Sequence, residues 1–373
     1  MKRHSIGRPR GPGRQLWFVF LLLAVFAVAA VAAGCGGSSS SSSGSNGKTS
    51  EAAATADPKV TGKTIGFVDI FGASAVEKRF YDSFTYAADQ AGWNVQFADG
   101  EGLPAKTLSA AQNFVNSGVD AIVFNSVPAE YVKPALKQAQ AKGIPTINLI
   151  TPATPGTYEG DYDENEAVVT KPLAEKLKED FPEGAKIGVL ESQQISASRE
   201  RVTALKKGLE GSNVEIAAEG EVPFATSAVA AGKVTTDMLN ANPDLSAIVG
   251  IFDQYSPAAL AALKTSQQPN VKFYSFYADS VNVPLMKRAE SPFVAVADSD
   301  IAKVGFYTVD QLLNYFATGT PIEGQTKIKI TPLIVTKDNL PTGEPDEGPV
   351  PFAELGKPYE AEWSKKYGIQ PGE

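Results

Sequence analysis

The chain has 373 residues, of which 43% are hydrophobic, and it carries a formal net charge of −8. At roughly 100–200 residues per domain, this length allows two domains, each large enough to bury its own core. The acidic charge argues against a nucleic-acid partner, since phosphate contacts require clustered Lys and Arg. The single cysteine is Cys35 and the single histidine is His4, both near the N-terminus. The rest of the chain therefore has no disulfide, no Cys/His metal site and no Ser-His-Asp or Cys-His catalytic group, and we predict no cofactor.

Residues 1–34 have the pattern of an export signal: five basic residues and no acidic residue, with an uncharged apolar run over 16–33. The segment VAAGC at 31–35 resembles the lipobox of bacterial lipoproteins, in which the chain is cut before the cysteine; Cys35 would then carry the lipid. The alternative is an uncut membrane anchor, because the apolar run is near the lower limit for crossing a bilayer. In both cases the remainder lies outside the cytoplasm, tethered by the Gly/Ser-rich segment 35–61.

The stretch KTIGFVDIFGAS at 63–74 predicts a short buried strand followed by a loop. Ser74 and Glu77 have the spacing of a capping box, which predicts that a helix begins there. Strand, loop and capped helix form the first half of a βαβ unit. In sheets built from such units, ligands bind beyond the carboxyl ends of the strands.

Strand and helix patterns alternate through the rest of the chain, which indicates parallel sheets. Four strand segments of the first half recur in the second half at offsets of 119–127 residues. The recurrence predicts two similar lobes from a duplicated unit, that is, an α/β fold with two Rossmann-like lobes whose parallel sheets are flanked by helices. A strand at 293–297, a helix at 301–317 and a strand at 327–335 follow.

Residues 338–373 are rich in Pro, Gly and acidic residues and are predicted to form a tail. Tyr359, Trp363 and Tyr367 are spaced by four residues, as on one face of a helix that docks on a lobe. The alternative is a disordered tail.

Several segments resemble type I periplasmic binding proteins of the ribose-binding-like group, the solute-capturing subunits of ABC importers. These segments are KTIGFVD at 63–69, GVDAIVFNSV at 118–127, KGIPTINL at 142–149, SASRER at 196–201 and DLSAIVGIFDQYSPAALAAL at 244–263. The resemblance covers about residues 62–336. It implies a first lobe of 62–161 plus 301–330 and a second lobe of 162–298 plus 331–337. Three crossovers, near 161–163, 299–300 and 331, would form the hinge, with the ligand in the cleft.

The resemblance implies a protein that is not an enzyme. It would be a monomer, lipid-anchored on the outer face of the cell membrane or in the periplasm, that captures a small polar solute such as a sugar and delivers it to an ABC permease. One alternative is a tethered sensor that presents the solute to a membrane receptor. Another is an extracellular hydrolase that uses Glu191, Asp253 and Asp69, although the sequence fixes no catalytic spacing.

Two charged residues are candidate ligand contacts. Arg199 matches the family's cleft arginine, and its fork of donors suits hydroxyls on adjacent carbons; the alternative is a surface pair with Glu200 or Glu191. Asp253 follows a predicted strand and matches an acidic cleft position, where a carboxylate would accept from hydroxyls. The alternative for Asp253 is a helix cap.

The aromatic candidates Phe71, Phe224, Phe252 and Tyr277 follow or end predicted strands on the cleft side. Flat rings cover the apolar face of a sugar or of a planar ring, and Phe71 and Phe224 match aromatic cleft positions of the family; the alternative for each ring is the core. Asp69 ends a buried strand, where it accepts hydrogen bonds either from a ligand or from loop N–H groups.

Three positions depart from the family pattern. The family's Asp-Arg pair after the fourth strand is Ile150-Thr151 here, its Asp after the strand at 271–276 is Tyr277, and its Gln near the second crossover is Ser299. We therefore take Thr151, Tyr277 and Ser299 as the ligand-facing candidates at these positions. Because three sugar-binding groups are missing, a less polar, aromatic-bearing or cationic solute is an alternative to an ordinary pentose or hexose.

Overall fold

The computed structural model describes residues 56–370. The predicted export signal, the lipidation site Cys35 and most of the predicted tether lie outside the described residues. Within 56–370, no helix combines the length and apolar composition needed to cross a membrane.

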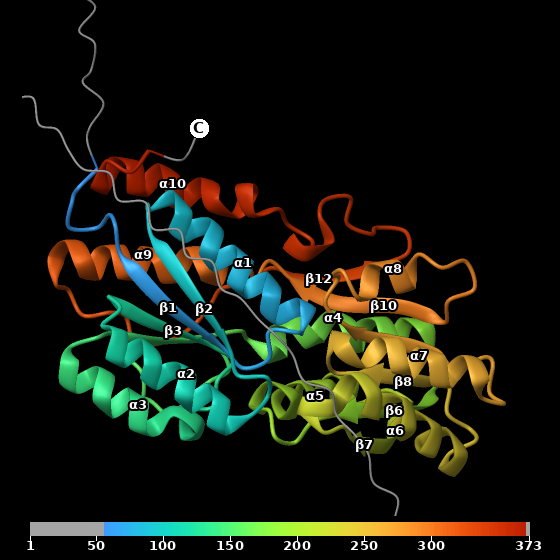
Figure 1. The fold of residues 1–373 in the computed structure, drawn as a ribbon. Coiled ribbons are helices and arrows are strands. Elements are labelled where there is room, and N and C mark those ends of the chain that lie inside the picture. The colour runs from blue at the N-terminus through green and yellow to red at the C-terminus, as the bar shows by residue number, and fades with distance from the viewer. Residues whose placement is uncertain (1–55, 371–373) are drawn as a thin grey trace, which may run out of the picture. The chain divides into compact units, whose positions relative to one another are not determined.

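The described chain forms two six-stranded sheets (Figure 1). The first has the order β11-β5-β4-β3-β1-β2, and all its neighbours are parallel. Its strands are β1 (Thr64–Asp69), β2 (Asn94–Asp99), β3 (Ala121–Asn125), β4 (Thr146–Ile150), β5 (Gly160–Asp163) and β11 (Gln325–Lys327). The second has the order β12-β10-β9-β8-β6-β7, with only β12 antiparallel to its neighbour. Its strands are β6 (Ala185–Glu191), β7 (Val214–Glu221), β8 (Ala247–Gly250), β9 (Lys272–Phe276), β10 (Phe293–Ser299) and β12 (Pro332–Thr336).

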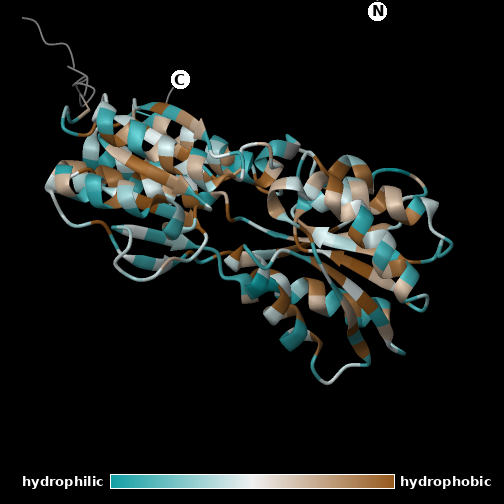
Figure 2. Ribbon diagram, turned by 60° about the horizontal axis from the view of Figure 1, so that its bottom comes forward, coloured by the Kyte–Doolittle hydropathy of each residue, from teal (hydrophilic) through white to brown (hydrophobic). Residues whose placement is uncertain are grey.

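Helices cover the sheets, and we call each sheet with its helices a lobe. The first lobe contains α1 (Ala75–Gln90), α2 (Pro104–Ser117), α3 (Ala129–Lys142) and α9 (Lys303–Thr318). The second contains α4 (Glu166–Asp180), α5 (Ser196–Leu209), α6 (Ser227–Ala241), α7 (Ser256–Thr265) and α8 (Asn282–Met286). The helices pack in pairs, α1 with α9, α2 with α3, α4 with α5 and α6 with α7. The central strands are largely hydrophobic (Figure 2), because they are buried on both faces.

The two sheets repeat one arrangement. The order β4-β3-β1-β2 of the first corresponds to β9-β8-β6-β7 of the second, which are the strand segments that recur in the sequence. The prediction of an α/β fold with two lobes of mostly parallel strands is confirmed.

The chain passes between the sheets three times. It leaves the first sheet after β5, returns from β10 to α9, and crosses again between β11 and β12. The prediction of one strand over 327–335 is wrong, because this stretch holds two short strands in different sheets. Pro332 is the first residue of β12, a position at which a strand tolerates a residue without an N–H group.

The C-terminal segment contains the helix α10 (Phe352–Tyr367), which packs on α9. Trp363 is fully buried and donates its indole N–H to Asp310 Oδ1 at 2.9 Å. Tyr359 stacks on Phe306, with ring centroids 5.8 Å apart. Of the two alternatives for this segment, the structure has the docked helix.

Helices α1 and α9 pack tightly at Gly305. A Cβ there would lie 2.5 Å from the backbone N of Phe84 and 2.5 Å from Ser83 Oγ. Ser83 Oγ also donates to the Ala302 carbonyl at the start of α9. The contact ties the returning helix α9 to the first helix of the lobe.

We expect Gly305→Ala to destabilise the protein, because the added methyl group meets the backbone of α1. The strain exceeds the ~1 kcal/mol by which Ala is favoured over Gly in a helix, and the free energy of unfolding should fall by about 1 kcal/mol or more. Urea denaturation measures it. Gly324→Ala is the control, since its Cβ meets nothing within 4 Å; equal stability of the two variants would contradict the close packing.

Candidate functional site

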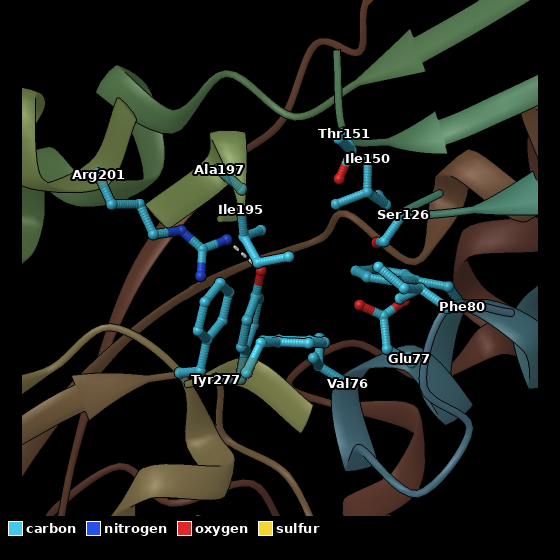
Figure 3. A pocket seen from close by; sticks show the side chains of 13 residues that line it. Val76, Glu77, Phe80, Ser126, Ile150, Thr151, Ile195, Ala197, Arg201 and Tyr277 are labelled. Atoms are coloured by element: carbon cyan, nitrogen blue, oxygen red, sulfur yellow. Dashed lines mark hydrogen bonds between the residues drawn. The ribbon is translucent and has the colours of Figure 1, made fainter. Parts of the chain in front are cut away.

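A pocket lies between the lobes, beyond the carboxyl ends of strands from both sheets (Figure 3). Its walls are residues that end or follow β1, β3 and β4 on one side and β6 to β9 on the other, together with α1 and α5. They are Ile70, Val76, Glu77, Phe80, Ser126, Ile150 and Thr151 of the first lobe and Ile195, Ala197, Arg201, Phe224, Phe252 and Tyr277 of the second. This is the edge at which parallel sheets bind ligands.

The lobes touch at this pocket. Phe71 of the first lobe meets Phe224 of the second edge to face, with ring centroids 5.8 Å apart. Gly102 lies against Ala225, since a Cβ on Gly102 would be 3.1 Å from that of Ala225. The pocket is narrow, with room for about one water molecule. A larger solute therefore enters only when the lobes separate.

Arg201 is the arginine that the structure brings into the pocket. It is fully buried, and its Nε donates to Glu166 Oε2 at 2.6 Å while its Nη2 donates to Glu164 Oε2 at 3.1 Å. It also donates to the Tyr277 hydroxyl and lies 4.8 Å from the centre of that ring. Burial raises the pKa of Glu166 to about 8, although Arg201 acts in the opposite direction.

Arg199, the arginine chosen from the sequence, does not line this pocket. Its side chain is exposed, donates to the Gln193 carbonyl, and borders a surface hollow shared with Lys327. Two residues along a helix correspond to a rotation of about 200°, so Arg199 and Arg201 face opposite ways. The sequence signal for Arg201 is its spacing of four from buried Ala197 and Leu205. A ligand contact by Arg199 stays a prediction.

Glu77 has a different role from the one its spacing suggested. Helix α1 begins after Ser74 as predicted, but the Ser74 side chain makes no capping hydrogen bond. The Glu77 carboxylate instead points into the pocket (Figure 3), and its Oε2 has no hydrogen-bond partner among the described residues. Burial raises the pKa of Glu77 well above its usual range, and the charges of Asp69 and Asp253 raise it further.

The predicted carboxylates Asp69 and Asp253 are both buried, in different settings. Asp69 accepts from the Phe71 N–H at 2.8 Å and from Asn125 Nδ2 at 2.9 Å, so it satisfies loop groups. Asp253 accepts no well-formed hydrogen bond from the described residues, and the alternative of a helix cap finds no support. Burial raises the pKa of Asp69 to about 7 and that of Asp253 to about 6.

The candidates at the three departures from the family pattern lie in or beside the pocket. Thr151 and Tyr277 line it, and Thr151 Oγ1 is buried without a partner among the described residues. Ser299, at the second crossover, donates to Glu164 Oε1 at 2.9 Å. Ile150 and Tyr277, which end β4 and follow β9, have φ values of +71° and +68°. A non-glycine residue there costs of order 1–3 kcal/mol, so the backbone is strained at matching points of both walls.

Arg79, which the sequence analysis did not single out, joins the lobes. It extends from α1 and donates to both Asp298 oxygens, at 3.0 and 3.2 Å, and to the Ala278 carbonyl at 3.1 Å. Burial alone would lower the pKa of Arg79, but Asp298 and Asp279 together raise it. The pair lies beside the second crossover, where it holds the lobes together.

The described residues contain no metal centre: within 56–370, no three His, Cys, Asp or Glu side chains are placed to hold a metal ion.

Residues 65–319 match the family model described as the periplasmic binding protein domain. The chain belongs to this family. It is 28% identical over 192 residues to the ribose import binding protein RbsB of Escherichia coli (strain K12), a match that covers 51% of this chain and 64% of that protein.

Solved structures show the same fold. A sugar ABC transporter protein from Yersinia enterocolitica subsp. enterocolitica 8081 matches with a TM-score of 0.71 and 17% identity, over 86% of this chain and all of the other. The 5-methylthioribose transporter solute binding protein of Thermotoga lettingae TMO matches with a TM-score of 0.66 and 18% identity, over 79% and 92% of the two chains. The predicted family and its two-lobe fold are confirmed.

Because these acids are buried, we predict that the free energy of unfolding of the ligand-free protein decreases as the pH rises. Folded-state pKa values of about 6 for Asp253, 7 for Asp69 and 8 for Glu166 exceed the ordinary values of 3.8 and 4.5. Acids whose pKa is raised on folding stabilise the protein fully below about pH 4, and this contribution is lost as the pH rises through the folded values. The free energy of unfolding, measured by urea denaturation from pH 5 to pH 8, should therefore fall.

Asp253→Asn tests whether the buried carboxylates cause this decrease in the free energy of unfolding. A shift of one pKa unit corresponds to about 1.4 kcal/mol of stability. The variant should lose part of the decrease between pH 5 and 7, whereas Asp89→Asn, at an exposed position of α1, should keep all of it. A stability that is constant or rises over this range would contradict the burial of these carboxylates.

Proposed function

We propose that this protein is the solute-binding component of an ABC importer. It is an extracytoplasmic lipoprotein, anchored through Cys35, that captures a small polar solute, a sugar or a sugar-like molecule, and delivers it to a permease. The observation that carries the proposal is the pocket at the carboxyl ends of both sheets, with walls from both lobes, in a chain of the periplasmic binding protein family.

The pocket walls suit such a solute. Phe224, Phe252 and Tyr277 supply flat apolar faces, Phe71 packs edge to face on Phe224, and Thr151 supplies a hydroxyl. Aromatic rings pack on the apolar face of a sugar ring, while a few polar groups fix its orientation. Relatives and structural neighbours support the class of solute: one is named for ribose import and another was solved with 5-methylthioribose.

Capture requires hinge motion. The chain crosses three times between the sheets, and the closed pocket has room for about one water molecule. The lobes therefore open about the crossovers and close on the solute.

The alternative of a tethered sensor uses the same cleft and differs in its membrane partner. Co-purification with a permease therefore separates the importer from the sensor. The alternative of an extracellular hydrolase predicts turnover of the bound solute, which we do not expect.

We expect a binding solute to raise the melting temperature of the purified protein in a screen of sugars, polyols, nucleosides and amines. At 100 times the Kd, binding stabilises by about 2.7 kcal/mol, which corresponds to a shift of several degrees. Phe224→Ala should weaken binding at least tenfold, because it removes the ring that closes the pocket against Phe71. Val229→Ala, at an exposed position of α6, is the control. No shift with any solute of this size range would refute the proposed function.

Arg199→Ala decides whether the arginine chosen from the sequence contacts the solute. Loss of the thermal shift, with the fold intact by circular dichroism, would place Arg199 in the site of the closed, liganded protein. A full shift would leave Arg201 as the arginine of the pocket.

A further inference from the structure

The buried positively charged side chains near the pocket already form ion pairs with carboxylates. Arg79 and Arg201 are the buried Lys or Arg side chains among residues 56–370. Arg79 is paired with Asp298, and Arg201 with both Glu164 and Glu166. Two guanidinium groups thus face three carboxylates. Their charge also acts on Glu77 and Asp253, but neither of these acids has a buried cation of its own as an ion-pair partner.

Three further buried carboxylates have oxygens without a partner among the described residues. They are Oε2 of Glu77, both oxygens of Asp253 and Oδ2 of Asp279. The side chain of Glu77 is more than nine-tenths buried, lines the pocket and points into it (Figure 3). All of these atoms are acceptors when ionised, so what they lack is a donor. A buried carboxylate without a counter-charge is costly, and a neutral hydroxyl would supply the hydrogen bond but not the charge.

The acids come from opposite lobes. Glu77 lies on α1 of the first lobe, next to Asp69, while Asp253 follows β8 in the second lobe. The charge of Asp253 acts on Glu77 from the other lobe. Closure of the lobes therefore brings like charges together, and a cation between them would turn this repulsion into attraction.

We propose that the solute carries a protonated amine, on a skeleton of sugar or polyol size, and that Glu77 is its counter-ion, with the negative charge of Asp253 behind it. The inference rests on the proposed function and narrows its class of solute. A metal ion does not fit, because the described residues offer no cluster of metal ligands. The same charge balance predicts that the lobes close on a cationic solute in preference to a neutral one.

A proton is the alternative partner for these carboxyls in the empty protein. The charged groups that face Glu77 are Asp69 of β1, Asp253 and Arg201, together with the hydroxyl of Ser126. An ammonium group that enters this site replaces bound protons, so binding should release protons to the buffer and tighten as the pH rises from 6 to 8.

The experiment compares matched amine and hydroxyl probes on the purified full-length protein. The pairs are D-glucosamine with D-glucose, and 1,4-dideoxy-1,4-imino-D-ribitol with 1,4-anhydro-D-ribitol. The shift in melting temperature at pH 7.5 ranks the probes by affinity. Isothermal titration calorimetry in two buffers of different ionisation enthalpy gives the number of protons that binding releases. We expect the amine member of at least one pair to bind at least tenfold more tightly, with proton release. Glu77→Gln should abolish the preference, and Asp89→Asn on the same helix should retain it.

The outcomes separate the two proposals. Hydroxyl members that bind as well as the amines, or a general screen in which every binding solute is neutral, would overturn the cationic solute and leave the receptor function standing. Binding of no solute at all would overturn both. A preference that survives in Glu77→Gln, or calcium chloride that binds and displaces the amine, would also overturn the inference. If Glu77→Gln does not fold, Asp253→Asn replaces it in the same experiment. Its preference for the amine over the hydroxyl probe should then be weaker than that of the unsubstituted protein.

Discussion

Two buried arginines organise the cleft, and they occupy matching places in the two halves of the chain. Arg79 lies ten residues after the end of β1, and Arg201 ten residues after the end of β6. Each extends from the helix that follows the first strand of its lobe, and each binds carboxylates near the crossovers, Asp298 for Arg79 and Glu164 for Arg201. Removing either partner would leave an uncompensated buried charge, which is far more costly than loss of a surface pair.

The two arginines differ in what they join. Arg79 connects the first lobe to the second, whereas Arg201 binds residues at the base of its own lobe and stacks against Tyr277. Equivalent positions of the two lobes thus form a bond between lobes in one case and a wall of the pocket in the other. The strained residues Ile150 and Tyr277 show the same pattern, because they stand at matching strand ends with different side chains. The shared backbone places both halves of the site, and the side chains distinguish them.

Electrostatics connects the site to its motion. The guanidinium groups of Arg79 and Arg201 pair with nearby carboxylates, so the buried acids Glu77 and Asp253, which come from opposite lobes, have no ion-pair partner of their own among the described residues. Bound protons relieve this charge in the empty protein, and the cationic solute that we propose would relieve it in the bound protein. On this proposal, closure and ligand charge are linked through the same few groups, beside the crossover at which Arg79 binds Asp298.

The sequence by itself determined the architecture and the edge at which the pocket lies. Apolar strand patterns, their recurrence and the alternation with helices fixed two parallel sheets, since local hydrophobic period and chain order are enough to specify such units. They also brought Phe224 and Tyr277 to the correct edge. Only the tertiary structure decided which side chains meet there. The choice of Arg201 over Arg199 depends on the rotation of α5, for which the spacing from Ala197 and Leu205 is a sequence signal. The place of Glu77 as a pocket acid instead of a cap depends on contacts between residues far apart in the chain, which no local pattern encodes.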